Sequence, residues 1–312
     1  MKISEISYRC LLSANEELLI NIGESVSIYD IKGAEPKKLI SLNGMRHGAY
    51  AAISPDGKIL ACSNTSGHIA IYSIATGEII ERSKGLSAEG RGLYFTEGSK
   101  QIISSTWDGR IFSFCLESGK ISVLAKTPLE QTELIPISDG EWLLYGAGYS
   151  DAGEGIYKFS TLENLNLEKL HSTPTYALNS AAYAINSAHI YIYGQVFDEF
   201  SSKGKDCVFL FDNESGDFGE IAVLDDISPS KILRPRKRWR SGRYGDFTCI
   251  DISHDEQLML LGYSDAVVIL SLVKSELVNI IKASNVSSVS FLSSKDKILI
   301  GSWSGIHTVN LE

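Results

Sequence analysis

Short apolar runs that alternate with polar residues recur along most of the chain, separated by turn-forming residues. The clearest stretch is residues 49–80, where three alternating runs are divided at Pro55-Asp56-Gly57, Ser66-Gly67 and Thr76-Gly77. Alternation with a period of two predicts strands that bury one face, and clusters of Gly, Pro, Asp and Ser predict tight turns. The pattern therefore predicts an all-β chain.

The layout of residues 49–80 is repeated along the sequence. A closely related copy fills residues 90–122, and weaker copies bring the total to seven, of which the last stops after three strands. The residues that open the first turn of each copy are Ser13, Ser54, Thr96, Ser138, Asn186, Ser253 and Leu292. Most of these positions are spaced by about 40 residues, the length of a four-stranded repeat unit.

Two turns and one strand end contain residues that are typical of a known family of repeat proteins. They are Ser54-Pro55-Asp56-Gly57-Lys58, Trp107-Asp108-Gly109 and the strand end Ile28-Tyr29-Asp30, which is matched by Ile71-Tyr72. With these residues the chain resembles the WD40-repeat β-propeller family. The resemblance implies a single closed seven-bladed β-propeller and favours a scaffold or protein-binding role, although a fold alone does not fix a function.

The repeat predicts one domain, residues 1–312, and approximate blade boundaries. The expected blades are residues 7–44, 45–85, 86–126, 127–172, 173–225, 245–283 and 284–312, with an insertion at 226–244. Because the last copy has three strands, residues 1–6 are assigned to the same blade. We expect residues 2–7, with Ile3 and Ile6 spaced as in a strand, to supply its missing outer strand.

Three insertions interrupt the repeat in blades 4 to 6, and their positions predict that they share one face. The longest contains residues 231–243, which hold seven positive charges around Trp239 and no acid. Three interpretations stay open for this segment: a loop that recognises an anionic group, a clamp across the protein's own acidic loops, or a solvated loop without a role.

We predict that a partner binds on the face that carries these insertions. The candidate partner-binding residues are Arg234, Arg236, Arg238, Trp239, Arg240, Arg243, Tyr149, Asp151, Phe197, Phe200, Trp107 and Trp303. Trp107 and Trp303 occupy equivalent places in their repeats, at the end of the second strand.

Net charge indicates the kind of partner. The formal charge of −9 disfavours nucleic acid and anionic membranes and favours a basic protein, for instance if the chain is an acidic inhibitor or immunity protein. Five scattered cysteines form no metal motif or disulfide framework, and the N-terminus lacks a signal-like apolar stretch. We therefore expect a cytoplasmic protein that is monomeric when alone.

Candidate chemistry is sparse, and we expect neither catalysis nor a cofactor. Common catalytic and phosphate-binding motifs are absent from the sequence. Acidic and amide residues assigned to first strands could hold a metal, namely Glu133, Asn179, Asp246, Asp251 and Asn285. They are widely dispersed, so a metal-dependent hydrolase or lactonase-like propeller is the alternative to a binding protein.

Overall fold

The structure is a computed structural model of residues 1–312. It describes residues 1–33, 35–42, 44–45, 48–83, 90–129, 132–138, 140–146, 155–161, 166–172, 176–183, 189–197, 204–223, 247–293 and 296–311.

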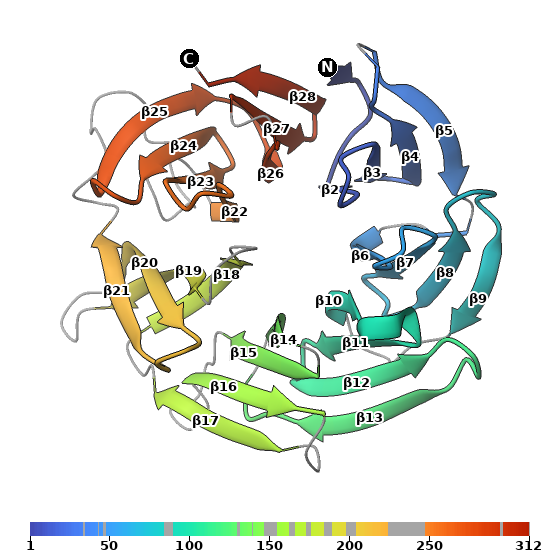
Figure 1. The fold of residues 1–312 in the computed structure, drawn as a ribbon, viewed down its shortest axis with the longest axis horizontal. Helices are drawn as coiled ribbons and strands as arrows, with labels where there is room; N and C mark the ends of the chain where they lie inside the picture. Colours follow the sequence, from blue (N-terminus) through green and yellow to red (C-terminus); the bar gives the residue numbers. More distant parts are fainter. Residues whose placement is uncertain are drawn as a thin grey trace. The chain divides into compact units, whose positions relative to one another are not determined.

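The chain is an all-β, seven-bladed β-propeller, which confirms the predicted fold class (Figure 1). Each blade is an antiparallel sheet of four strands. The blades belong to two compact units: an N-terminal unit, Tyr8–Pro174, and a C-terminal unit, Thr175–Glu312 together with Met1–Ser7. Each unit is described by itself below.

The N-terminal unit contains blades 1 to 4, coloured from blue to green in Figure 1. Blade 1 comprises β2 (Arg9–Leu12), β3 (Leu18–Ile22), β4 (Val26–Asp30) and β5 (Lys37–Leu42). Blade 2 comprises β6 (Gly48–Ile53), β7 (Ile59–Asn64), β8 (Ile69–Ser73) and β9 (Ile79–Ser83). Blade 3 comprises β10 (Gly90–Phe95), β11 (Gln101–Thr106), β12 (Arg110–Cys115) and β13 (Ile121–Lys126), with a short 3-10 helix at Glu97–Ser99. Blade 4 comprises β14 (Glu133–Ser138), β15 (Glu141–Gly146), β16 (Gly155–Ser160) and β17 (Leu167–Ser172).

The C-terminal unit contains blades 5 to 7. Blade 5 comprises β18 (Tyr176–Tyr183), β19 (His189–Phe197), β20 (Gly204–Asp212) and β21 (Phe218–Val223). Blade 6 comprises β22 (Phe247–Ile252), β23 (Leu258–Tyr263), β24 (Ala266–Ser271) and β25 (Glu276–Lys282). Blade 7 comprises β26 (Val286–Phe291), β27 (Lys297–Ser302), β28 (Gly305–Asn310) and β1 (Lys2–Ile3).

The N-terminal strand completes blade 7, as the sequence predicts. β1 pairs with β28 through Lys2 opposite His307 and Ile3 opposite Ile306. The strand is shorter than the predicted residues 2–7, since only Lys2–Ile3 are paired. Ser7 nevertheless stays attached to the blade, because its backbone N–H donates to the carbonyl of Ser302 at 2.9 Å.

A recurrent turn explains why serine opens the first turn in several of the repeats. In blade 2 the Ser54 hydroxyl donates to Asp56 at 2.6 Å and accepts from the backbone N–H of Ile59 at 2.9 Å. Gly57 takes a φ of 70°, which favours glycine. The same bond between side chains joins Ser13 to Asn15 in blade 1 and Ser253 to Asp255 in blade 6. Short polar side chains thus satisfy the turn locally.

The core lies between neighbouring blades. Within each unit, consecutive blades are side by side in chain order, and their first strands adjoin (Figure 1). Second and third strands are largely buried, whereas fourth strands such as β5 and β9 are mostly exposed. Blades 1 and 2, for example, bury Ile20, Leu60 and Tyr72 in one cluster. Each sheet therefore buries its apolar faces on its neighbours, as expected for a propeller.

Candidate partner-binding surface

Most of the predicted partner-binding residues lie outside the described residues. These are Arg234, Arg236, Arg238, Trp239, Arg240, Arg243, Tyr149, Asp151 and Phe200. Phe197 ends β19. Trp107 and Trp303 are therefore the predicted residues whose side chains the structure describes. They belong to different units, and the predicted grouping of the insertions on one face stays a prediction.

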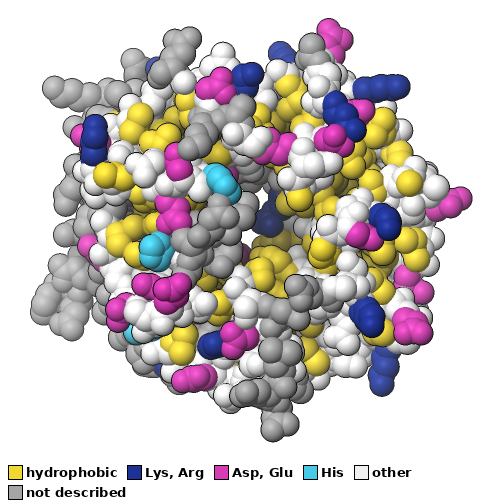
Figure 2. Space-filling model, viewed as in Figure 1, with side chains coloured by type: hydrophobic (Ala, Val, Ile, Leu, Met, Phe, Trp, Pro, Cys, Tyr) yellow, Lys and Arg dark blue, Asp and Glu magenta, His cyan; other side chains and the backbone are white. Residues whose placement is uncertain are grey.

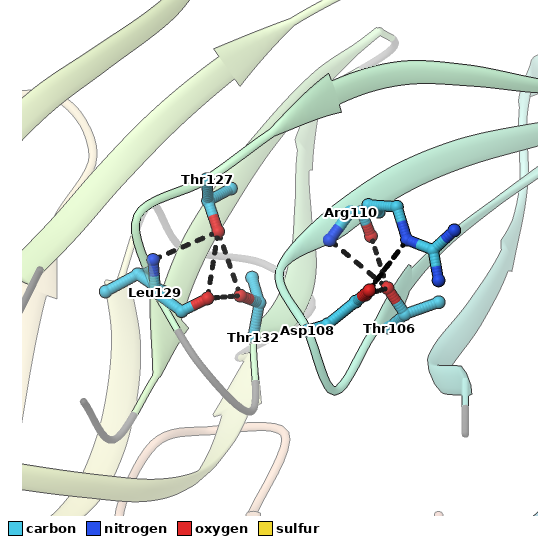
Figure 3. Close-up of polar contacts among 6 residues, drawn as sticks. All are labelled: Thr106, Asp108, Arg110, Thr127, Leu129 and Thr132. Atoms are coloured by element: carbon cyan, nitrogen blue, oxygen red, sulfur yellow. Dashed lines mark hydrogen bonds and ion pairs between the residues drawn. The ribbon is translucent and has the colours of Figure 1, made fainter. Parts of the chain in front are cut away.

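Trp107 is the first residue of the turn between β11 and β12, and its side chain is 41% exposed. The residues beside it are held by polar contacts (Figure 3). Thr106 donates through its hydroxyl to the carboxylate of Asp108, and the Thr106 hydroxyl accepts from the backbone N–H of Arg110 at 3.2 Å. Arg110 also donates through Nε to Asp108 at 3.0 Å. The exposed indole is thus carried by a tightly bonded turn.

A second polar cluster supports this turn from the connection between blades 3 and 4 (Figure 3). The hydroxyl groups of Thr127 and Thr132 lie 3.1 Å apart, and Thr127 accepts from the backbone N–H of Leu129 at 3.2 Å. The backbone N–H of Thr127 donates to the carbonyl of Gly109 at 2.8 Å. The turn of Trp107 is therefore fixed to the connection that leads into the next blade.

Charges near Trp107 are balanced. Burial alone would raise the pKa of the Asp108 carboxyl, but hydrogen bonds from Arg110 and Thr106 lower it overall. Asp108 is accordingly ionised at neutral pH and paired with Arg110. On the face drawn in Figure 2, acidic and basic side chains are interspersed with hydrophobic ones. Trp107 thus presents a hydrophobic ring beside a neutralised charge pair.

Trp303 occupies the corresponding turn of blade 7 and is 58% exposed. The Ser302 hydroxyl donates to the carbonyl of Gly305 at 2.9 Å and accepts from the backbone N–H of Ser304 at 3.1 Å. The backbone N–H of Trp303 donates to the carbonyl of Asn285 at 3.2 Å. In both units, therefore, an exposed indole follows a hydroxyl residue that organises the turn.

The residues considered for a metal take part in other contacts or lie outside the described region. Glu133 accepts from the hydroxyl of Tyr145 at 2.8 Å, and Asp251 accepts from the backbone N–H of Phe291 at 2.7 Å. Asn179 has no described side chain, and Asp246 lies outside the described residues. In the part of the chain that the structure describes, no group of three or more His, Cys, Asp or Glu side chains could hold a metal ion.

Two side-chain clusters were not predicted from the sequence. In the N-terminal unit, the Arg9 guanidinium carbon lies 4.1 Å from the centre of the Tyr50 ring, a cation–π contact. In the C-terminal unit, Glu256 accepts from His189 Nδ1 at 3.0 Å and from the Tyr191 hydroxyl at 3.1 Å. The residues of each cluster are far apart in sequence, so no local sequence motif predicts these contacts.

All five cysteines are free thiols, and Cys10, Cys62 and Cys207 are buried. Within the described residues, no helix has the length and apolar character needed to cross a membrane. Comparison with known proteins finds no family model that matches this chain and no match among curated proteins.

Proposed function

We propose that the chain is a non-enzymatic propeller that binds another protein through exposed aromatic side chains on its turns between second and third strands. The observation that carries the proposal is the placement of Trp107, a 41% exposed indole on a turn fixed by two polar clusters. Tryptophan is enriched among the residues that dominate binding energy, and a rigid turn lowers the entropy lost on binding.

A basic protein is the proposed partner. The formal charge of −9 favours cationic partners by long-range attraction, and the charge pair beside Trp107 leaves that turn without a local charge of its own. An inhibitor or immunity protein that covers a basic toxin or nuclease fits this charge. WD40-type scaffolds are a precedent for propellers that bind other proteins without catalysis. Membership of that family is supported by two turns, the serine turn of blade 2 and the Trp107-Asp108-Gly109 turn.

The cytoplasm is the proposed compartment. Five free cysteines, three of them buried, suit a reducing environment in which thiols persist. We propose a monomer as the unbound state. For the basic segment at residues 231–243, recognition of an anionic group on the partner is the proposal, with a clamp on the protein's own surface as the competing interpretation.

The experiment compares the wild-type protein with Trp107→Ala and with Val123→Ala. Val123 is a suitable control because it is a 52% exposed apolar residue on β13 of the same blade. Proteins that co-purify with the tagged chain from its native source are identified, and the purified partner is then titrated. Loss of an anchoring indole should weaken binding by at least about 2 kcal/mol, whereas Val123→Ala should change it little.

The partner should be basic, and its association rate should fall with added salt. Equal affinities for the wild type and Trp107→Ala would place binding elsewhere. An association rate independent of salt would contradict the proposed charge. A third variant, with Arg236, Arg238 and Arg240 changed to Glu, tests the basic segment: unchanged partner binding would remove its role in recognition.

A further inference from the structure

The N-terminal unit contains a pocket of about 590 Å³ where the first strands of three blades adjoin. We call it the first-strand pocket. It is lined by the ends of β2 and β6, by the turns that follow them, and by Leu93 and Tyr94 of β10. Strands alternate in direction, so this end of the blades is opposite to the end that carries the Trp107 turn. Its volume is within the roughly 300–1,000 Å³ typical of sites for small molecules.

The wall of the first-strand pocket is mainly apolar. The apolar lining residues are Leu11, Leu12, Ala14, Ala51, Ala52, Ile53, Pro55 and Leu93. Hydroxyl groups on the lining are used within the protein, because Ser13 donates to Asn15 and Ser54 donates to Asp56. The carboxylate of Asp56 also pairs with Lys58 at 3.5 Å. The lining thus offers little uncompensated charge to a ligand.

Tyr94 is a further polar residue on the lining. Its ring packs 5.7 Å from the ring of Trp142, which holds it in place. Burial is the main cause that raises the pKa of Tyr94; the nearby Glu133 adds to the effect and Arg9 opposes it. The phenol is therefore protonated at neutral pH and can donate a hydrogen bond.

We propose that the first-strand pocket binds a small, uncharged and largely apolar molecule, whose carbonyl oxygen accepts a hydrogen bond from the Tyr94 hydroxyl. Burying the apolar surface of the ligand against the apolar walls favours binding. A hydrogen bond from the Tyr94 hydroxyl then fixes the orientation of the ligand. A charged molecule would lose its hydration without gaining an ion pair, because the charged lining residue Asp56 is already paired. This site is independent of the proposed partner surface.

The probe is prodan, an uncharged naphthyl ketone whose fluorescence shifts when it enters an apolar site. Ala14→Trp places a bulky side chain at the pocket, since Ala14 is an exposed lining residue. Ala75→Trp is the matched control, because Ala75 is an exposed turn residue of the same unit that does not line the pocket. Tyr94→Phe removes the hydroxyl and keeps the ring. Circular dichroism establishes that each variant is folded.

Prodan should bind the wild type and Ala75→Trp saturably with one site per chain, and Ala14→Trp should abolish that binding. Tyr94→Phe should weaken it about three- to tenfold, the effect of one lost hydrogen bond. Absence of saturable binding, or binding that Ala14→Trp leaves intact, would overturn the site. An unchanged affinity in Tyr94→Phe would overturn the assigned hydrogen bond. Partner binding through Trp107 is measured separately, so the two proposals can fail independently.

Discussion

The carboxylate of Asp251, on β22, accepts a 2.7 Å hydrogen bond from the backbone N–H of Phe291 at the end of β26, and so links blade 6 to blade 7. Burial raises the pKa of Asp251 from 3.8 to about 7, against the lowering effect of hydrogen bonds from the N–H groups of Phe291 and Ile252. The folded protein therefore holds this proton to a higher pH than the unfolded chain does.

We predict that Asp251→Asn removes part of the pH dependence of stability. Because the folded-state pKa is raised, the contribution of Asp251 to the free energy of unfolding falls as pH rises from about 4 to about 7, and is constant above. Asparagine keeps an acceptor for Phe291 without the buried charge. Asp251→Asn should therefore be more stable than the wild type by about 4 kcal/mol at pH 8, with little difference near pH 4.

Urea denaturation of both proteins at pH 4, 6 and 8 measures this difference. Subtracting the two curves isolates Asp251 from the other titrating groups. A variant that is less stable than the wild type at pH 8, or a difference that stays constant with pH, would contradict the prediction.

Ile3 should contribute far more to stability than Ile6, its neighbour in the same segment. Ile3 is 6% exposed and lies in β1, whereas Ile6 is 38% exposed. Ile3→Ala should lower the free energy of unfolding by about 2–4 kcal/mol, and Ile6→Ala by about 0.5 kcal/mol. Deleting residues 1–7 should cost more than Ile3→Ala, since it also removes the bond from the Met1 amino group to Thr308. The melting temperatures of the three variants, measured by thermal unfolding, rank the three losses of stability. Equal melting temperatures for the deletion and the wild type would refute the role of β1.

Gly109 and Gly57 should differ in their tolerance of alanine, although both have positive φ, 82° and 70°. A Cβ atom at Gly57 meets nothing within 4 Å, whereas one at Gly109 collides with the carbonyl of Leu129 and with Thr127. Gly57→Ala should cost about 1 kcal/mol of backbone strain, and Gly109→Ala about 2–4 kcal/mol because the connection must shift. Chemical denaturation measures both. Equal losses would show that the contact between the Trp107 turn and that connection is unimportant.

Tyr191 and Glu256 should be energetically coupled across blades 5 and 6. The Tyr191 hydroxyl donates to Glu256, which His189 also contacts. In a cycle of Tyr191→Phe and Glu256→Gln, we expect a coupling energy of about 1 kcal/mol in the free energy of unfolding. The control cycle replaces Glu256→Gln with Glu276→Gln, because Glu276 pairs with Lys274 instead. Additive effects in the first cycle, or equal coupling in both, would contradict the contact.

The sequence predicts only part of the proposed partner-binding surface in a form that the structure describes. Trp107 and Trp303 could be singled out because they occupy the same place in two repeats, and both side chains are exposed on hydroxyl-organised turns. The first-strand pocket had no such signal. Its lining comes from three repeats, and each contributes ordinary residues of an inner strand or a serine turn.

The sequence by itself determined the number of blades, their four-stranded make-up and the use of the N-terminus in blade 7. These follow from interactions close along the chain: alternation sets which face a strand buries, and turns such as Ser54 to Asp56 satisfy their own hydrogen bonds. Only the tertiary structure decided the bond of Asp251 with Phe291, the cluster around Glu256 and the pocket beside Tyr94. Each depends on how one sheet is packed against the next, which brings together residues from different repeats and leaves no local pattern.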